Sequence, residues 1–75
     1  MLNDYIIVRE LLSRFSLNSL LNKYIVIVAD GKSELRLAQT EIKSSGDKAQ
    51  IVGDFGAFVV EDFSFCSMGL TIVLA

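Results

Sequence analysis

Residues 55–65 restrict the fold of this chain more than any other stretch, because they hold four of its five phenylalanines and only two charged side chains. Aromatic and β-branched residues suit a pleated, half-buried surface, so we expect the longest and most buried strand over about residues 56–65. Successive strand side chains point to opposite faces, and a regular alternation would leave both faces of this strand mixed. A β-bulge at Glu61 and Asp62 would resolve this, because a bulge bends a strand and shifts its alternation by one residue. The shift would bring four apolar side chains to one face: Phe58, Val60, Phe63 and Phe65.

The length and the apolar content of the chain predict one small domain that associates with copies of itself. A chain of 75 residues buries only roughly 60–65% of the surface that it exposes when unfolded. Apolar residues make up 52% of the chain, against a usual share of roughly 45–50%. We therefore expect a single domain over residues 1–75 and a homo-oligomer that covers the surplus apolar surface.

The residue types that are missing argue against an enzyme. The chain has no histidine, which is the usual general base and the commonest metal ligand. Its one cysteine, Cys66, has no partner for a disulfide within the chain. The N-terminus lacks the basic region of a signal peptide, and no apolar run approaches the roughly 18 residues of a membrane-spanning helix. The sequence thus predicts a non-catalytic cytoplasmic protein with no cofactor, no metal site and no membrane contact.

We expect one amphipathic helix at the N-terminus, over about residues 4–21. Asn3 or Asp4 is a suitable N-cap, and apolar residues recur at helical spacing up to Ser16. The phase fails there, which indicates a break followed by a short second turn. The leucines of this turn either cap one end of the core or lie on a subunit interface. With the apolar C-terminus they form the predicted interface: Leu17, Leu20, Leu21 and Leu74.

An unbroken apolar run predicts a strand over about residues 23–29, covered on both faces. Asp30 and Gly31 follow, and this pair is a strong hairpin signal because both turn residues tolerate positive φ. Alternating leucines and charged residues support a returning strand over about residues 33–43. The alternative is a helix over residues 34–44, whose apolar residues also fit helical spacing and would make a βαβ unit. The turn signal and the alternation favour the hairpin.

Further turn signals at regular spacing divide the rest of the chain into three more strands. These signals lie at residues 44–47, at Gly53-Asp54 and at residues 66–69. The predicted strands cover about residues 48–52, 56–65 and 70–75. The predicted fold class is therefore α+β, with one N-terminal amphipathic helix followed by a five-stranded antiparallel sheet or a small, partly closed barrel.

Three short motifs have structural explanations. Residues 31–33 read Gly-Lys-Ser after an apolar strand, but Val26 stands where a phosphate loop needs its first glycine. Glu61 and Asp62 are neighbours on a strand and point to opposite faces, so they cannot converge on one substrate or metal unless a bulge redirects one. Cys66 has no nearby base or basic residue in the sequence to form a thiolate. We therefore assign no catalytic, cofactor-binding or metal-binding residue.

The basic residues permit an alternative function. All seven lie within residues 1–48, whereas residues 49–75 carry only acids. That acidic, phenylalanine-rich part is either buried sheet or a face for a basic partner. A basic groove lined with stacking aromatics could bind single-stranded nucleic acid, although an isoelectric point near 4.8 is low for such a module. The possible nucleic-acid contacts are Lys23, Tyr24, Lys32, Arg36, Lys43 and Lys48.

The order of the predicted elements, one helix and then five strands with a long bent fourth, resembles the Sm-like small barrel over nearly the whole chain. Val26, Val28, Asp30 and Gly31 are loosely similar in spacing to the first hairpin of that family. The glycine of the family's second strand and its second, RNA-contacting signature have no counterpart here. The resemblance implies a nucleic-acid-binding or regulatory small barrel. The residues themselves favour a small interaction domain that associates with itself through apolar surface, or with a protein partner.

Overall fold

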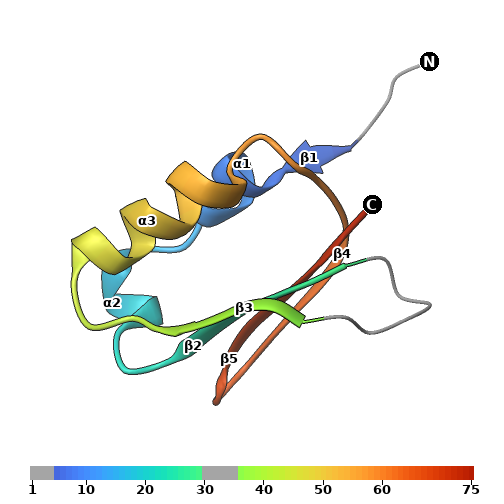
Figure 1. The fold of residues 1–75 in the computed structure, drawn as a ribbon. Coiled ribbons are helices and arrows are strands. Elements are labelled where there is room, and N and C mark those ends of the chain that lie inside the picture. The colour runs from blue at the N-terminus through green and yellow to red at the C-terminus, as the bar shows by residue number, and fades with distance from the viewer. Residues whose placement is uncertain (1–4, 30–35) are drawn as a thin grey trace.

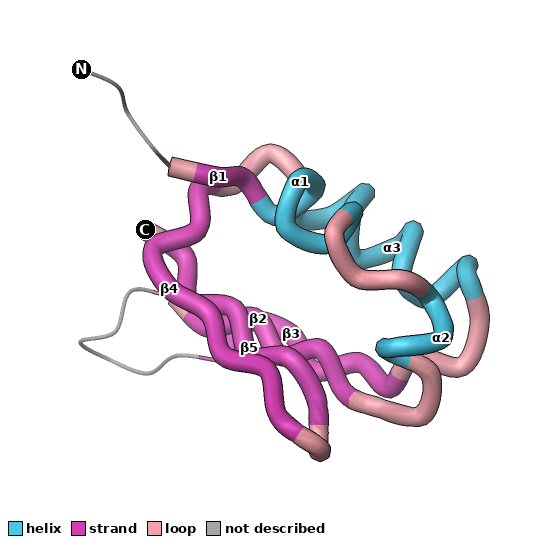
Figure 2. Tube along the Cα trace, turned by 180° about the vertical axis from the view of Figure 1, so that it is seen from behind, coloured by secondary structure: helices cyan, strands magenta, loops and turns pink. Residues whose placement is uncertain are grey.

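A computed structural model describes residues 5–29 and 36–75 as a small α+β domain, in which one layer of helices covers one face of a five-stranded sheet (Figure 1). Seen from behind, the helices lie in one layer and most of the strands in a second, with the N-terminal strand beside the first helix (Figure 2). In chain order the elements are β1 (Ile6–Ile7), α1 (Val8–Ser13), α2 (Leu17–Leu20), β2 (Tyr24–Val28), β3 (Arg36–Glu41), α3 (Ser45–Phe55), β4 (Val59–Cys66) and β5 (Gly69–Leu74).

The sheet is mixed rather than purely antiparallel, with the strand order β1-β4-β5-β2-β3. β5 and β2 run parallel, whereas every other neighbouring pair in this order is antiparallel. Parallel neighbours need a long crossover connection, and here β3, α3 and β4 supply it between β2 and β5. The sheet is open, so the predicted antiparallel arrangement and the partly closed, Sm-like barrel are both wrong.

The N-terminal part forms a short strand and two short helices, so the single helix predicted over residues 4–21 is not confirmed. α1 begins only at Val8. Two backbone amides there donate hydrogen bonds to carbonyl oxygens of residues far along the chain. The amide of Val8 donates to the oxygen of Phe58, and that of Arg9 donates to the oxygen of Gly56, each at 3.0 Å. The predicted break at Ser16 is confirmed, because its hydroxyl accepts from the amide of Ser19 at 3.2 Å and caps α2.

The region predicted as a strand over residues 48–52 is part of helix α3. A carboxylate oxygen of Asp47 accepts hydrogen bonds from the backbone amides of Lys43 (2.8 Å) and Ser44 (3.1 Å) just before the first turn. An acid in the first turn also complements the helix dipole. The residues that we interpreted as a turn are therefore the N-terminal cap of a helix.

β3 pairs antiparallel with β2 over Arg36–Glu41, so the returning strand is confirmed where the structure describes it. The helical alternative for residues 34–44 is wrong over that strand. The turn predicted at Asp30 and Gly31, like the phosphate-loop motif at residues 31–33, lies outside the described residues.

The core lies between the helix layer and one face of the sheet. On β2, Ile25 and Ile27 point into it, whereas Tyr24 and Val26 point to the opposite face, which no described helix covers. The buried apolar side chains are Val8, Leu11, Leu12, Leu20, Ile25, Ile27, Ile42, Ile51, Val60, Leu70, Ile72 and Leu74.

The predicted bulge in β4 is confirmed. The β4–β5 register shifts between Val60 and Asp62, so Glu61 is the extra residue. Phe63 and Phe65 then lie opposite the buried Ile72 and Leu70, and share the helix-side face with Val60. Phe58 precedes the strand. The expectation that this strand is the most buried is wrong, because residues 61–66 are all exposed.

Asn22 provides a test of the link between α2 and β2. Its φ of 65° lies in the left-handed region, where a side chain other than Asn or Gly costs about 1–2 kcal/mol. Asn22→Val should therefore lower the free energy of unfolding by about that amount, whereas Asn22→Gly should leave it nearly unchanged. Urea denaturation measures both. Asn18→Ala, at an exposed position of α2, is the control and should not destabilise. Equal losses for Asn22→Gly and Asn22→Val would contradict the backbone explanation.

Candidate functional site

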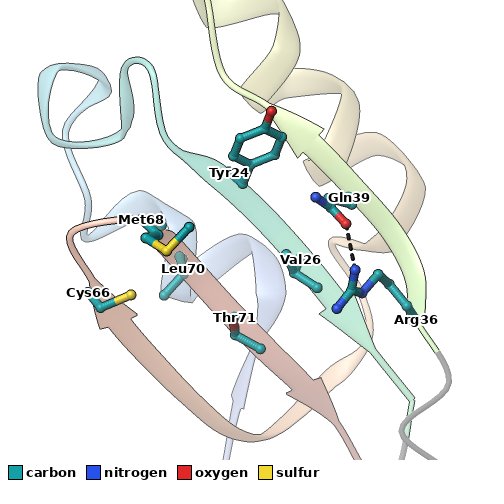
Figure 3. Close-up of a pocket in the computed structure, with 9 residues that line it drawn as sticks. Tyr24, Val26, Arg36, Gln39, Cys66, Met68, Leu70 and Thr71 are labelled. Atoms are coloured by element: carbon teal, nitrogen blue, oxygen red, sulfur yellow. Dashed lines mark hydrogen bonds between the residues drawn. The ribbon is translucent and has the colours of Figure 1, made fainter.

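The uncovered face of the sheet carries a pocket of about 320 Å³ (Figure 3), at the low end of the volumes that small-molecule sites have. Side chains from four strands and the β4–β5 turn surround it. The lining residues are Tyr24, Val26, Arg36, Gln39, Cys66, Met68, Gly69, Leu70 and Thr71.

The pocket combines apolar surface with one cationic side chain but offers no catalytic pair. The guanidinium of Arg36 donates to the amide oxygen of Gln39 at 2.7 Å. The Cys66 thiol is free and exposed, and a nucleophilic cysteine needs a neighbouring base or cation. Arg36 on β3 is not such a neighbour, because β5 and β2 lie between it and Cys66 on β4. Within residues 5–29 and 36–75, no group of three acidic or cysteine side chains is close enough to hold a metal ion.

Two of the six predicted nucleic-acid contacts, Tyr24 and Arg36, line this pocket together. The ammonium of Lys43 lies 3.9 Å from a carboxylate oxygen of Glu41. Lys23 is half-buried. Lys32 lies outside the described residues.

Lys48 is also directed away from the pocket, because its ammonium donates to the backbone oxygen of Phe15 at 2.8 Å on the helix side of the molecule. Arg36 is thus the one basic side chain among the described residues that lines the pocket. Of the predicted contacts that the structure describes, only Tyr24 and Arg36 share this pocket.

Two of the four leucines of the predicted interface lie inside the molecule. Leu20 and Leu74 are buried in the core, so they present no surface to a second molecule. Leu17 packs against the core, and Leu21 follows it at the end of α2; both keep part of the side chain exposed. The loss of helical phase after Ser16 reflects the start of a separate helix, α2, which has Ser16 as its N-cap and buries Leu20.

A different apolar surface is exposed on β4. Phe63 and Phe65 lie on the helix-side face, yet the two residues are 44% and 43% exposed, because no described helix reaches over this part of the strand. Phe65 contacts Phe15, with ring centroids 5.0 Å apart, a distance typical of favourable aromatic pairs. We call residues 61–66 of β4, with Phe63 and Phe65, the aromatic edge.

The outer side of the aromatic edge pairs with no other strand among the described residues. β1 covers β4 at Val59 and Val60, and beyond them the outermost position of the sheet is free in the parts of the chain that the structure describes. Unpaired strand edges bind further strands unless they are protected.

The register identifies which backbone groups point outward. β4 and β5 are joined by a two-residue turn between the paired Cys66 and Gly69, and such a flanking pair exchanges its hydrogen bonds. The alternation of an antiparallel ladder then directs Ser64 toward β5 and leaves the amides and carbonyls of Phe63 and Phe65 facing out. The outward amide of Phe63 donates to its neighbour Asp62, at 2.8 Å to Oδ1.

The Asp62 carboxylate therefore occupies one outward-facing backbone amide of the aromatic edge. This hydrogen bond gives one of the two adjacent acids a structural role. Glu61 occupies the bulge, and both side chains are exposed. The sequence indicated where the phenylalanines and the bulge lie. It did not show that the helices would leave this end of β4 uncovered.

Comparison of the chain with protein-family models, with curated proteins and with solved structures finds no match. In the described part of the chain, no helix has the length and apolar character needed to cross a membrane.

Proposed function

We propose that this chain is a small, non-catalytic interaction domain that associates with itself through the aromatic edge. The observation that carries the proposal is the coincidence of two half-exposed phenylalanines with an outward-facing backbone on residues 61–66. Either feature alone is common on protein surfaces. Together they supply hydrogen bonds and apolar area to a partner strand, which is how β-strand addition works.

The residue types of the aromatic edge support a protein partner rather than a substrate. Aromatic side chains dominate the energetics of protein interfaces, because they bury a large area at low entropic cost. The single exposed cysteine fits a reducing setting such as the cytoplasm, and we keep that location as part of the proposal. The proposed homo-oligomer thus still forms through apolar surface, but its interface lies on β4 and not on the predicted leucines.

Replacement of the two phenylalanines tests the proposal. Phe63→Ser with Phe65→Ser should weaken self-association at least about 30-fold, since a single central aromatic of an interface already contributes about 2 kcal/mol or more. Light scattering over a concentration series, at two salt concentrations, gives the solution mass. The wild-type mass should not depend on salt, because apolar contacts are not screened.

Leu37→Ser is the matched control. Leu37 is 43% exposed, like Phe65, but lies on β3 at the opposite edge of the sheet. Phe63→Ser alone is a second variant that leaves the Phe15–Phe65 contact of the monomer in place. A wild-type chain that stays monomeric at every concentration would refute the proposal, and so would Leu37→Ser weakening association as much as the β4 variants.

A further inference from the structure

We infer that two copies of this chain pair antiparallel along β4, with Ser64 of one copy opposite Ser64 of the other, so that two five-stranded sheets join into one. This inference rests on the proposed function and deepens it, because it names the surface, the symmetry and the register. A two-fold axis through a pair of identical strands is the simplest closed arrangement of two copies.

The outward backbone groups fit this register. In it, Phe63 of each copy lies opposite Phe65 of the second copy, and these are the residues whose amides and carbonyls face outward. Two such pairs allow four backbone hydrogen bonds across the axis. Ser64, whose backbone groups face β5, lies at the axis in a position that exchanges no hydrogen bonds with the second copy.

The side chains fit the same register. Both Phe63–Phe65 pairs lie on the helix-side face, beside Phe15 of each copy, and cross-strand aromatic pairs are among the favourable neighbours in sheets. An axis through Phe65 would pair Phe65 with itself but would set Phe63 against Ser67 in the turn. An axis at Ser64 therefore matches both aromatic residues at once.

The charges of β4 also favour an antiparallel pair. Asp62 would lie opposite the uncharged Cys66 of the second copy. The two Asp62 carboxylates would stand four residues apart along the strands, roughly 13 Å at about 3.3 Å a residue, which exceeds the Debye length of about 8 Å at physiological salt. A parallel, in-register pair would place the acids side by side. The antiparallel arrangement keeps the like charges apart.

The part of β4 that no described strand covers on its outer side matches the length of the same part in a second copy. β1 ends its pairing with β4 at Val60, and the β4–β5 turn begins after Cys66. Residues 62–66 of one copy would occupy this interval opposite residues 66–62 of the second copy. Asp62 would have to release the amide of Phe63, so it limits the strength of the pair. Asp62→Ala should tighten association by about tenfold or more, since a hydrogen bond that competes with pairing is removed from each copy.

Cysteine pairing tests the register directly. In this register, residue 64 of one copy and residue 64 of the second form a pair without backbone hydrogen bonds. The Cα atoms of such a pair lie about 4.5 Å apart, which is within the range of disulfides. Ser64→Cys with Cys66→Ser should therefore give a covalent dimer with oxidised glutathione, which takes up the two electrons and two protons of the thiols and leaves as two reduced glutathiones. Non-reducing electrophoresis and mass spectrometry detect the product.

Two controls define the background. The wild-type chain, with Cys66 alone, should not cross-link, because the two Cys66 residues would be as far apart as the two Asp62 residues. Asp54→Cys with Cys66→Ser places the thiol on the exposed face of α3 and reports random collisions. Ser64→Cys and Cys66→Ser are small changes at exposed positions, so the variants should fold.

Each outcome of these experiments supports or overturns the register, the proposed function or both. A light-scattering dimer that cross-links through position 64 and not through Asp54→Cys supports the register. A dimer that does not cross-link there, or that cross-links only when Ser64→Cys is combined with native Cys66, would overturn the register but keep the proposed function. A monomer at every concentration would overturn both.

Discussion

Gly69→Ala is expected to lower the free energy of unfolding by about 3–5 kcal/mol, from strain and overpacking together. Gly69 has a φ of 151°, which L residues rarely adopt. It also lies opposite Tyr24 in the parallel pairing of β5 with β2. A Cβ at this position would stand 2.0 Å from the backbone oxygen of Tyr24 and 2.8 Å from its nitrogen, so the two central strands would have to separate.

Loss of stability on this scale is serious for a small domain, whose total is only roughly 4–11 kcal/mol at this length. Gly53→Ala is the control, because nothing lies within 4 Å of a Cβ there and the residue is inside α3. It should stabilise the protein by about 0.5–1 kcal/mol through helix propensity. Urea denaturation followed by circular dichroism measures both variants. A cost for Gly69→Ala below about 1 kcal/mol would show that β5 and β2 do not approach each other as closely as described.

Local patterns in the sequence predicted those elements whose residues interact mainly with sequence neighbours. β2 follows from its unbroken apolar run and the bulge at Glu61 from the alternation of β4, and both are present. The expectation that β2 is covered on both faces is wrong, because Tyr24 is exposed on the face that no described helix covers. The break at Ser16 was equally predictable, from the loss of helical phase, and the structure shows Ser16 as the N-cap of α2 there. Asp47 carried the same kind of signal for α3, but Ser44, Ser45 and Gly46 also suit a turn, and the turn interpretation was wrong.

Features that depend on distant contacts were not predictable in this way. α1 begins at Val8 because carbonyls of Gly56 and Phe58 accept its first amides, and no local pattern announces such partners. The parallel pairing of β2 with β5 likewise depends on the whole crossover through α3. A sheet predicted only from the pairing of strands that follow one another in the sequence is therefore antiparallel, as our predicted sheet was.

The residue types of the candidate site were predictable from the sequence, but the position of the site on the surface was not. An apolar surplus and a phenylalanine-rich strand were visible in the sequence, and they indicated self-association. Which apolar residues remain outside depends on how far the helices extend over the sheet. Because α1 and α2 are short, they bury Leu20 but leave Phe63 and Phe65 at the margin of the helix layer.

Ile72→Ala is expected to lower the free energy of unfolding by about 2–5 kcal/mol, the second large effect. Ile72 is fully buried at the middle of β5, opposite Phe63 on β4 and beside Ile27 on β2. Truncation leaves a cavity that two flanking strands and the helix layer cannot easily fill. Ile72→Val should cost only about 0.5–1.5 kcal/mol, so the pair of variants gives a graded response to lost volume.

Val73→Ala is the control for Ile72→Ala, because it lies next along the same strand and points to the uncovered face. Both changes lower β-propensity, so the difference between their costs isolates burial in the core. Val73→Ala should cost about 1 kcal/mol or less at every protein concentration. A larger cost that grows with concentration would mean that a second copy covers the open face, and this would contradict assembly through β4. The same stability measurement thus separates the core from the two surfaces through which copies could meet.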